Sequence, residues 1–113
     1  MPFINTKASC EIKKEKELAI KDKLGSAITL LGKSESWLML EFQDNCRMYF
    51  RGKNDSDMAI VEVALLGKAS DAQYDALTAK ITEIISEELG IDGSAIYVKY
   101  METEHWGYNG MNF

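Results

Sequence analysis

Apolar residues recur every three or four positions in two stretches of the chain, which is the period of an amphipathic helix. In the first stretch the steps are four, three and four residues, at Ile20, Leu24, Ala27 and Leu31. We predict a helix from about Glu11 to Leu31, ended by Gly32 in a left-handed conformation. The second stretch has the same period, at Tyr74, Leu77, Ile81, Ile84 and Ile85. We predict that this second helix ends at Leu89–Gly90.

The tripeptide Lys-Ala-Ser precedes each predicted helix, at positions 7–9 and 68–70. Ser70 and Gln73 have the spacing of a capping box, in which each side chain accepts a hydrogen bond from the other residue's backbone N–H. By analogy, Ser9 is the predicted N-cap of the first helix. The two halves of the chain therefore have similar patterns.

Short runs with the composition of β-strands flank both helices. These runs are Pro2–Thr6, Trp37–Phe42, Ala59–Leu66 and Ala95–Tyr100, and a further brief strand is predicted at Met48–Phe50. The order gives two strand–helix–strand units, at about 2–43 and 58–101, within a single domain spanning 1–113. A right-handed crossover makes the strands of each unit parallel. We predict an α/β fold with a four-stranded mixed sheet and both helices on one face.

One face of such a sheet is left without a helix. The run Ala59–Leu66 reads AIVEVALL, which is apolar on both faces apart from Glu62. A strand of this kind is usually covered on both sides. We therefore expect several copies of the chain to associate symmetrically through their sheets.

Composition narrows the class of partner. The formal charge is −5 and the isoelectric point about 4.9, whereas nucleic-acid binding needs a concentrated basic face. Five lysines between Lys13 and Lys23 alternate with acidic residues, as on a solvated helix face. The sequence has neither a membrane-spanning apolar run nor a signal-peptide pattern. We expect a cytoplasmic protein that binds neither nucleic acid nor membrane.

The common catalytic signatures are missing from the sequence. Cys10 and Cys46 form no CxxC pair and are interpreted as reduced structural thiols, and His105 is the only histidine. A zinc site would lack ligands, and neither a GxSxG elbow nor a glycine-rich phosphate loop occurs. We expect no metal and no cofactor.

Pro2 is the only proline in the chain. One interpretation is that a chain terminus tolerates a missing N–H at no cost. The other is that Met1 is trimmed, as is usual before proline, which leaves a secondary amine as the terminus. Local sequence does not decide between the two.

Several segments together resemble the macrophage migration inhibitory factor family of the tautomerase superfamily. They are the opening MPFINT, Leu31-Gly32-Lys33, ALLGKA at 64–69, IYVKY at 96–100 and the ending HWGYNGMNF. The resemblance implies a homotrimer of two strand–helix–strand units with active sites between neighbouring subunits. It also implies keto–enol tautomerisation of phenylpyruvate-like acids and dopachrome analogues, with Pro2 as the general base once Met1 is removed.

The resemblance also assigns substrate contacts. Lys33 matches the lysine that binds the substrate carboxylate, although its position past a helix end also suits a cation that stabilises the helix dipole. Leu66 matches the position that presents a backbone N–H, and Tyr97 matches a tyrosine supplied by the adjacent subunit. Trp37, Tyr108 and Phe113 match an aromatic rim that stacks on an aryl substrate. Met39 and Met101 are candidates for the apolar wall or for the core, and the orientation of Trp106 is left open.

Two positions depart from the family pattern. Lys99 stands where well-known members carry an asparagine that contacts the far end of the substrate, and a lysine there favours acidic substrates. Residues 58–61 read MAIV where some members have a CxxC, so no thiol–disulfide oxidoreductase activity is expected.

Two other functions stay open at this point. The first is a cytokine-like or host-modulating protein that is exported without a signal peptide, binds a cell-surface receptor and has only secondary tautomerase activity. The second is a monomeric ferredoxin-like ligand-binding module in which Pro2 is incidental.

Overall fold

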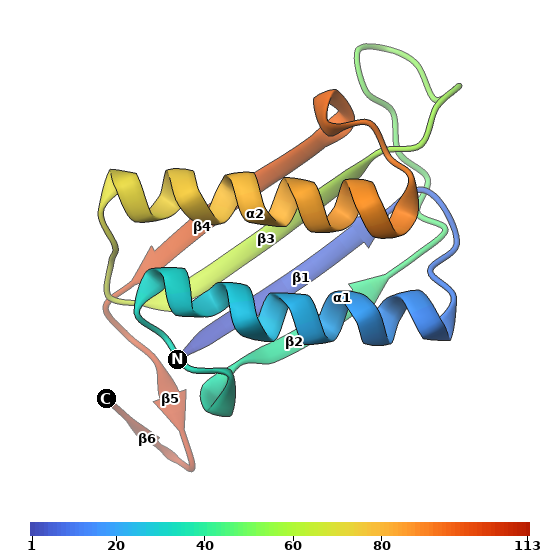
Figure 1. Ribbon diagram of the computed structural model, residues 1–113. Helices are drawn as coiled ribbons and strands as arrows, with labels where there is room; N and C mark the ends of the chain where they lie inside the picture. Colours follow the sequence, from blue (N-terminus) through green and yellow to red (C-terminus); the bar gives the residue numbers. More distant parts are fainter.

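The computed structural model describes residues 1–113 and shows two helices lying side by side across one face of a sheet (Figure 1). The strands of the sheet are β1 (Pro2–Ala8), β2 (Met39–Gln43), β3 (Ala59–Leu66) and β4 (Ile96–Thr103), and the helices are α1 (Lys14–Ala27) and α2 (Asp71–Leu89). The strand order is β2-β1-β3-β4. Pairing is parallel within each unit and antiparallel between β1 and β3. The predicted α/β fold is confirmed.

Short elements complete the chain. Three 3-10 turns lie at Ile28–Leu31, Glu35–Trp37 and Gly93–Ala95, and a hairpin of β5 (Gly107–Tyr108) and β6 (Met111–Asn112) ends the chain. The hairpin, which the sequence pattern did not predict, turns at Asn109 and Gly110, both with positive φ. Glycine and asparagine tolerate that conformation better than other residues.

The core lies between the sheet and the two helices. Alternate residues of β3 point toward the helices and are buried, namely Ala59, Val61, Val63 and Leu65. The predicted faces of both helices meet them, with Ile20, Leu24, Leu77, Ile81, Ile84 and Ile85 almost fully buried. The helix periodicity in the sequence therefore identified the core correctly.

The predicted ends of the second helix are confirmed. The Ser70 hydroxyl accepts a hydrogen bond from the backbone N–H of Gln73 at 3.2 Å, and the Gln73 side chain accepts one from the N–H of Ser70 at 2.9 Å. Gly90 ends the helix with a φ of +69°. Gly32 also has a left-handed conformation, at +71°, but the chain before it is a 3-10 turn rather than α-helix.

The predicted N-cap role of Ser9 is wrong. β1 continues to Ala8, and α1 begins only at Lys14 after an extended residue with no side-chain cap. The Ser9 hydroxyl instead accepts from the backbone N–H of Met58 at 2.9 Å and donates to the carboxylate of Asp57 at 3.3 Å. Ser9 therefore fastens the end of β1 to the segment that leads into β3.

Three predicted strand segments are also corrected. Met48–Phe50 forms no strand, because Phe50 pairs only with Lys53 across a tight turn through Arg51 and Gly52. Trp37 lies in a 3-10 turn rather than at the start of β2, since the Ser34 side chain caps that turn. The fourth strand extends to Thr103, three residues beyond its predicted end.

The sheet face opposite the helices is open. Register places Tyr97, Lys99 and Met101 of β4 on this face, all of them exposed. At its centre, Glu62 accepts from Lys7 at 3.0 Å and lies 3.8 Å from Lys99. The face combines exposed apolar side chains with one cluster of opposite charges. None of the helices is both long and apolar enough to cross a membrane.

The capping box gives a test of the fold. We expect Ser70→Ala to lower the free energy of unfolding by about 1 kcal/mol, because it leaves the N–H of Gln73 without its partner. Urea denaturation at fixed protein concentration measures the change. Ser56→Ala, in an exposed loop, is the matched control, and equal midpoints for the two variants would contradict the capping role.

Candidate active site

Pro2 lies at the first position of β1, directly opposite Leu65 at the end of β3. Its side chain is buried. The residue before it, Met1, is held by its carbonyl oxygen, which accepts a hydrogen bond from the backbone N–H of Leu66 at 3.2 Å. The peptide bond between Met1 and Pro2 is thus fixed beside the end of β3.

Lys33 brings a positive charge to the same place. The left-handed Gly32 turns the chain after the 3-10 segment, and the Lys33 ammonium then donates a hydrogen bond to the carbonyl oxygen of Leu66 at 3.1 Å. Partial burial, and to a smaller degree the charge of Lys33, lower the pKa of the Met1 amine below its usual value. Both effects disfavour a cation at the terminus.

The arrangement around Met1 suits an acid–base reaction. If Met1 is removed, the nitrogen of Pro2 becomes a secondary amine and the N–H of Leu66 loses its partner. A base, a backbone donor and the ammonium of Lys33 would then lie close together at the end of β3. The Met1 carbonyl oxygen marks where an oxygen atom of a ligand would accept the bond from Leu66.

The predicted aromatic rim residues gather into one cluster. The Trp37 and Tyr108 rings meet edge to face at 5.2 Å, and those of Tyr108 and Phe113 stack at 6.2 Å. The hairpin and the N-terminus lie at the same end of the sheet (Figure 1). About half or more of each side chain is exposed, so the cluster presents ring surface to solvent. Trp106 accepts a bond at its carbonyl from the N–H of Phe113, and its side chain is half-buried.

Tyr97 and Lys99 are not brought to Pro2 within one chain. Pro2 aligns through Leu65 with Glu102, and at a strand rise of about 3.3 Å per residue Tyr97 lies roughly 16 Å away along β4. Tyr97 packs instead edge to face on Phe50, at 5.1 Å. A site that contains both Pro2 and Tyr97 would need two chains.

The sequence patterns missed a contact that secures this end of the sheet. The Tyr74 hydroxyl accepts from the N–H of Ala69 at 3.3 Å and donates to Glu102 at 2.6 Å. Burial first, and the bond to Glu102 second, raise the pKa of Tyr74. Tyr74 fits the helix period, and its hydroxyl in addition ties the loop after Leu66 to β4.

A metal site requires several ligating side chains close together, and a nucleophilic cysteine requires a thiol with a lowered pKa. No group of three or more His, Cys, Asp or Glu side chains is placed to hold a metal ion. Cys10 and Cys46 are both free thiols, and burial, followed by the charge of Asp57, raises the pKa of Cys10. A raised pKa makes the thiol a poorer nucleophile at neutral pH.

Comparison with known proteins gives one family. A family model described as macrophage migration inhibitory factor (MIF) matches residues 1–113. Leishmania major MIF2 is 32% identical, with a TM-score of 0.93 over 100% of this chain and 97% of that one. A homologue from Prochlorococcus marinus is 28% identical, with a TM-score of 0.88 over 98% of each chain.

A third solved structure shares the fold alone. It is a fused 4-OT protein described as a symmetric trimer, 20% identical, with a TM-score of 0.87 over 97% of this chain and 94% of that one. No curated protein sequence matches the chain.

The influence of Lys33 on the terminus is testable. We expect Lys33→Met to raise the pKa of the terminal amine while leaving it below the usual value, because burial still opposes the charged form. The pKa is followed by NMR in protein released from a fusion with Met1 as its first residue. Lys68→Met, an exposed change, should leave the pKa unaltered. An unchanged or lower pKa in Lys33→Met would refute the electrostatic coupling.

Proposed function

The chain belongs to the macrophage migration inhibitory factor family, and on that premise we propose that it is a keto–enol tautomerase of aromatic 2-oxo acids such as phenylpyruvate. Its fold is that of the tautomerase superfamily, which supports isomerase activity in general. The general base is the amine of Pro2 after loss of Met1. The observation that carries the proposal is the hydrogen bond from Leu66 to the Met1 carbonyl, because it puts a donor next to the nitrogen that would be freed.

The proposed reaction moves one proton. The neutral amine of Pro2 takes a proton from the carbon next to the ketone, the C–H electron pair forms the C=C bond, and negative charge develops on the ketone oxygen. That oxygen then receives the proton of the new ammonium, directly or through a water molecule that the ammonium reprotonates, and the neutral amine is restored. Lys33 holds the substrate carboxylate, and the Leu66 N–H donates to a substrate oxygen.

The amine must be unprotonated at the working pH to act as a base. An ordinary terminal amine is largely protonated at neutral pH. Burial and Lys33 lower the pKa of the terminal amine in the chain that retains Met1, and the same surroundings would act on the nearby nitrogen of Pro2. The proline ring also fixes φ, which limits the directions in which the nitrogen points.

We propose further that the active molecule is a homotrimer. The open sheet face has exposed apolar residues, among them Tyr97 with 59% of its side chain exposed and Met39 with 68%. The related fused 4-OT protein is described as a symmetric trimer. In such an assembly Tyr97 and Lys99 of a neighbouring subunit complete the wall opposite Pro2. The charge of Lys99 then favours substrates with a second acidic group.

The role of the Pro2 nitrogen gives the most direct test. Inserting an alanine between Met1 and Pro2 turns that nitrogen into an amide, which has no basicity. We expect phenylpyruvate enolisation to fall by about 10²- to 10⁴-fold. Mass spectrometry should show that the unmodified chain lacks Met1.

Pro2→Gly keeps an N-terminal amine but loses the ring, so it should reduce the rate less than the insertion does. An alanine inserted between Asn54 and Asp55, in an exposed loop, is the matched control and should retain activity. Full activity after the N-terminal insertion would overturn the assignment of the base.

The proposed shared site gives a second test. Light scattering should give three times the chain mass of 12.7 kDa. Tyr97→Ala chains and chains with the N-terminal insertion should each be nearly inactive. Co-refolded in equal amounts, they should recover about a quarter of the native activity, because some interfaces pair an intact Pro2 with an intact Tyr97. A monomeric mass would favour the ligand-binding module, and mixed trimers without activity would contradict a shared site.

A further inference from the structure

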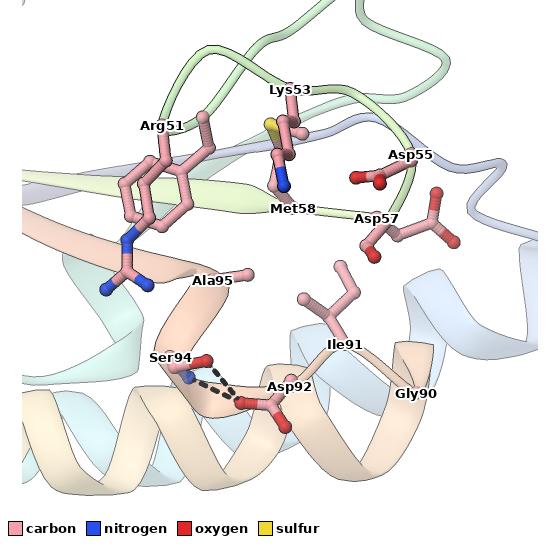
Figure 2. A pocket seen from close by; sticks show the side chains of 12 residues that line it. Arg51, Lys53, Asp55, Asp57, Met58, Gly90, Ile91, Asp92, Ser94 and Ala95 are labelled. Carbon is pink, nitrogen blue, oxygen red and sulfur yellow. Dashed lines mark hydrogen bonds between the residues drawn. The ribbon is translucent and has the colours of Figure 1, made fainter.

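A wide hollow lies at the opposite end of β3 from Pro2. It has a volume of about 740 Å³, within the range of small-molecule sites. Met58, which lines it, immediately precedes β3, whereas Pro2 lies opposite the other end of that strand. Three segments form the hollow, namely the loop 50–58, the chain after α2 at 90–92 and the 3-10 turn at 94–95 (Figure 2).

The floor of the hollow is apolar. Ile91 and Met58 reach it from opposite sides and are almost fully buried, with 1% and 6% of their surfaces exposed. Ala95 adds a third small apolar surface (Figure 2). Because so little of Ile91 and Met58 is open to solvent, a short hydrocarbon group would meet chiefly the half-buried Ala95 and would itself lose water there.

The walls of the hollow have charges of both signs in separate places. Arg51 lies at one end, and Asp55 and Asp57 lie at the other, with Lys53 between them at the upper rim (Figure 2). Asp92 lies on the lower wall. These five charged side chains form no ion pair within the chain.

Three of the charged groups are nevertheless held in place. The Arg51 guanidinium lies 5.2 Å from the centre of the Phe50 ring, and the Asp57 carboxylate accepts the hydroxyl of Ser9 at 3.3 Å. One oxygen of Asp92 accepts from the N–H and the hydroxyl of Ser94, at 2.8 and 2.6 Å. Charges that are positioned but not neutralised favour a ligand that supplies their partners, because less order is lost on binding.

We infer that this hollow binds a zwitterionic small molecule of the α-amino acid class with an apolar side chain. The ligand carboxylate faces Arg51 and Lys53, and its ammonium faces Asp55 and Asp57. Its side chain lies against Ala95, at the floor that Ile91 and Met58 close from below the surface. A ligand with a single charge would satisfy one end of the hollow and leave the charges at the other end without a partner. The site is separate from the proposed tautomerase chemistry and does not depend on it.

L-Leucine is the probe, and NMR titration of the ¹⁵N-labelled full chain is the measurement. We expect saturable shifts at the amides of Gly52, Ser56 and Ser94, with a Kd of about 1 mM. Isopentylamine, which lacks the carboxylate, and N-acetyl-leucine, which lacks the ammonium, should bind about tenfold more weakly. Equal binding of either analogue, no saturable shift, or shifts confined to the surroundings of Pro2 would each overturn the inference.

Variants separate the two ends of the hollow. Lys53→Met and Asp55→Asn remove exposed charges that make no hydrogen bond or ion pair in the chain, so both should fold normally. Each should weaken leucine binding by about tenfold. Lys53→Met should leave the already weak binding of isopentylamine unchanged, whereas Asp55→Asn should weaken it further. Lys68→Met is the matched control, and equal leucine affinity in all four proteins would overturn the proposed contacts.

Discussion

The antiparallel pairing of β1 with β3 determines most of what this molecule can do. Each strand–helix–strand unit forms its own parallel pair, and the β1–β3 ladder from Pro2–Leu65 to Ala8–Ala59 is the junction of the two units. Because the ladder is antiparallel, the start of the chain lies against the end of β3. Met1 and Pro2 are therefore held against the sheet, although termini generally fray.

The same junction explains why, besides burial, Lys33 lowers the pKa of the terminal amine. Its ammonium is anchored by the Leu66 carbonyl, a neutral acceptor, rather than by a carboxylate. Its charge is thus positioned without being cancelled, and it acts on the amine a short distance away. In a chain with a net charge of −5, this gives a locally positive site. The nearby charge of Lys33 affects the terminal amine more than the net charge of the chain does, because solvent and salt screen the charges of distant residues.

Local sequence predicted those features that depend on neighbouring residues. The helix periods, the capping box at Ser70 and the left-handed glycines all follow from contacts within a few positions. Ser9 belongs to an identical tripeptide, yet its partner is Met58, 49 residues away, and no local pattern contains that information. The hydrogen bond from the Leu66 N–H to the Met1 carbonyl could not be predicted from local sequence for the same reason, since it forms only when β1 and β3 are paired. The resemblance to a family supplied the candidate residues there, and the chain's own geometry supplied their relation.

The separation of Tyr97 from Pro2 follows from the sheet itself. On β4, Tyr97 aligns with Ile60 while Pro2 aligns with Leu65, and no side-chain rotation spans that offset. One chain therefore presents the proposed base, a donor and a cation on one side only. The open sheet face has Tyr97 and Lys99, which contact Phe50 and Glu62 within their own chain and lie away from Pro2. Glu62 keeps Lys99 close to the sheet through a contact at 3.8 Å, and covering that face with a second copy would strengthen the contact by excluding water. In the proposed trimer, assembly and the completion of the site are then the same physical event.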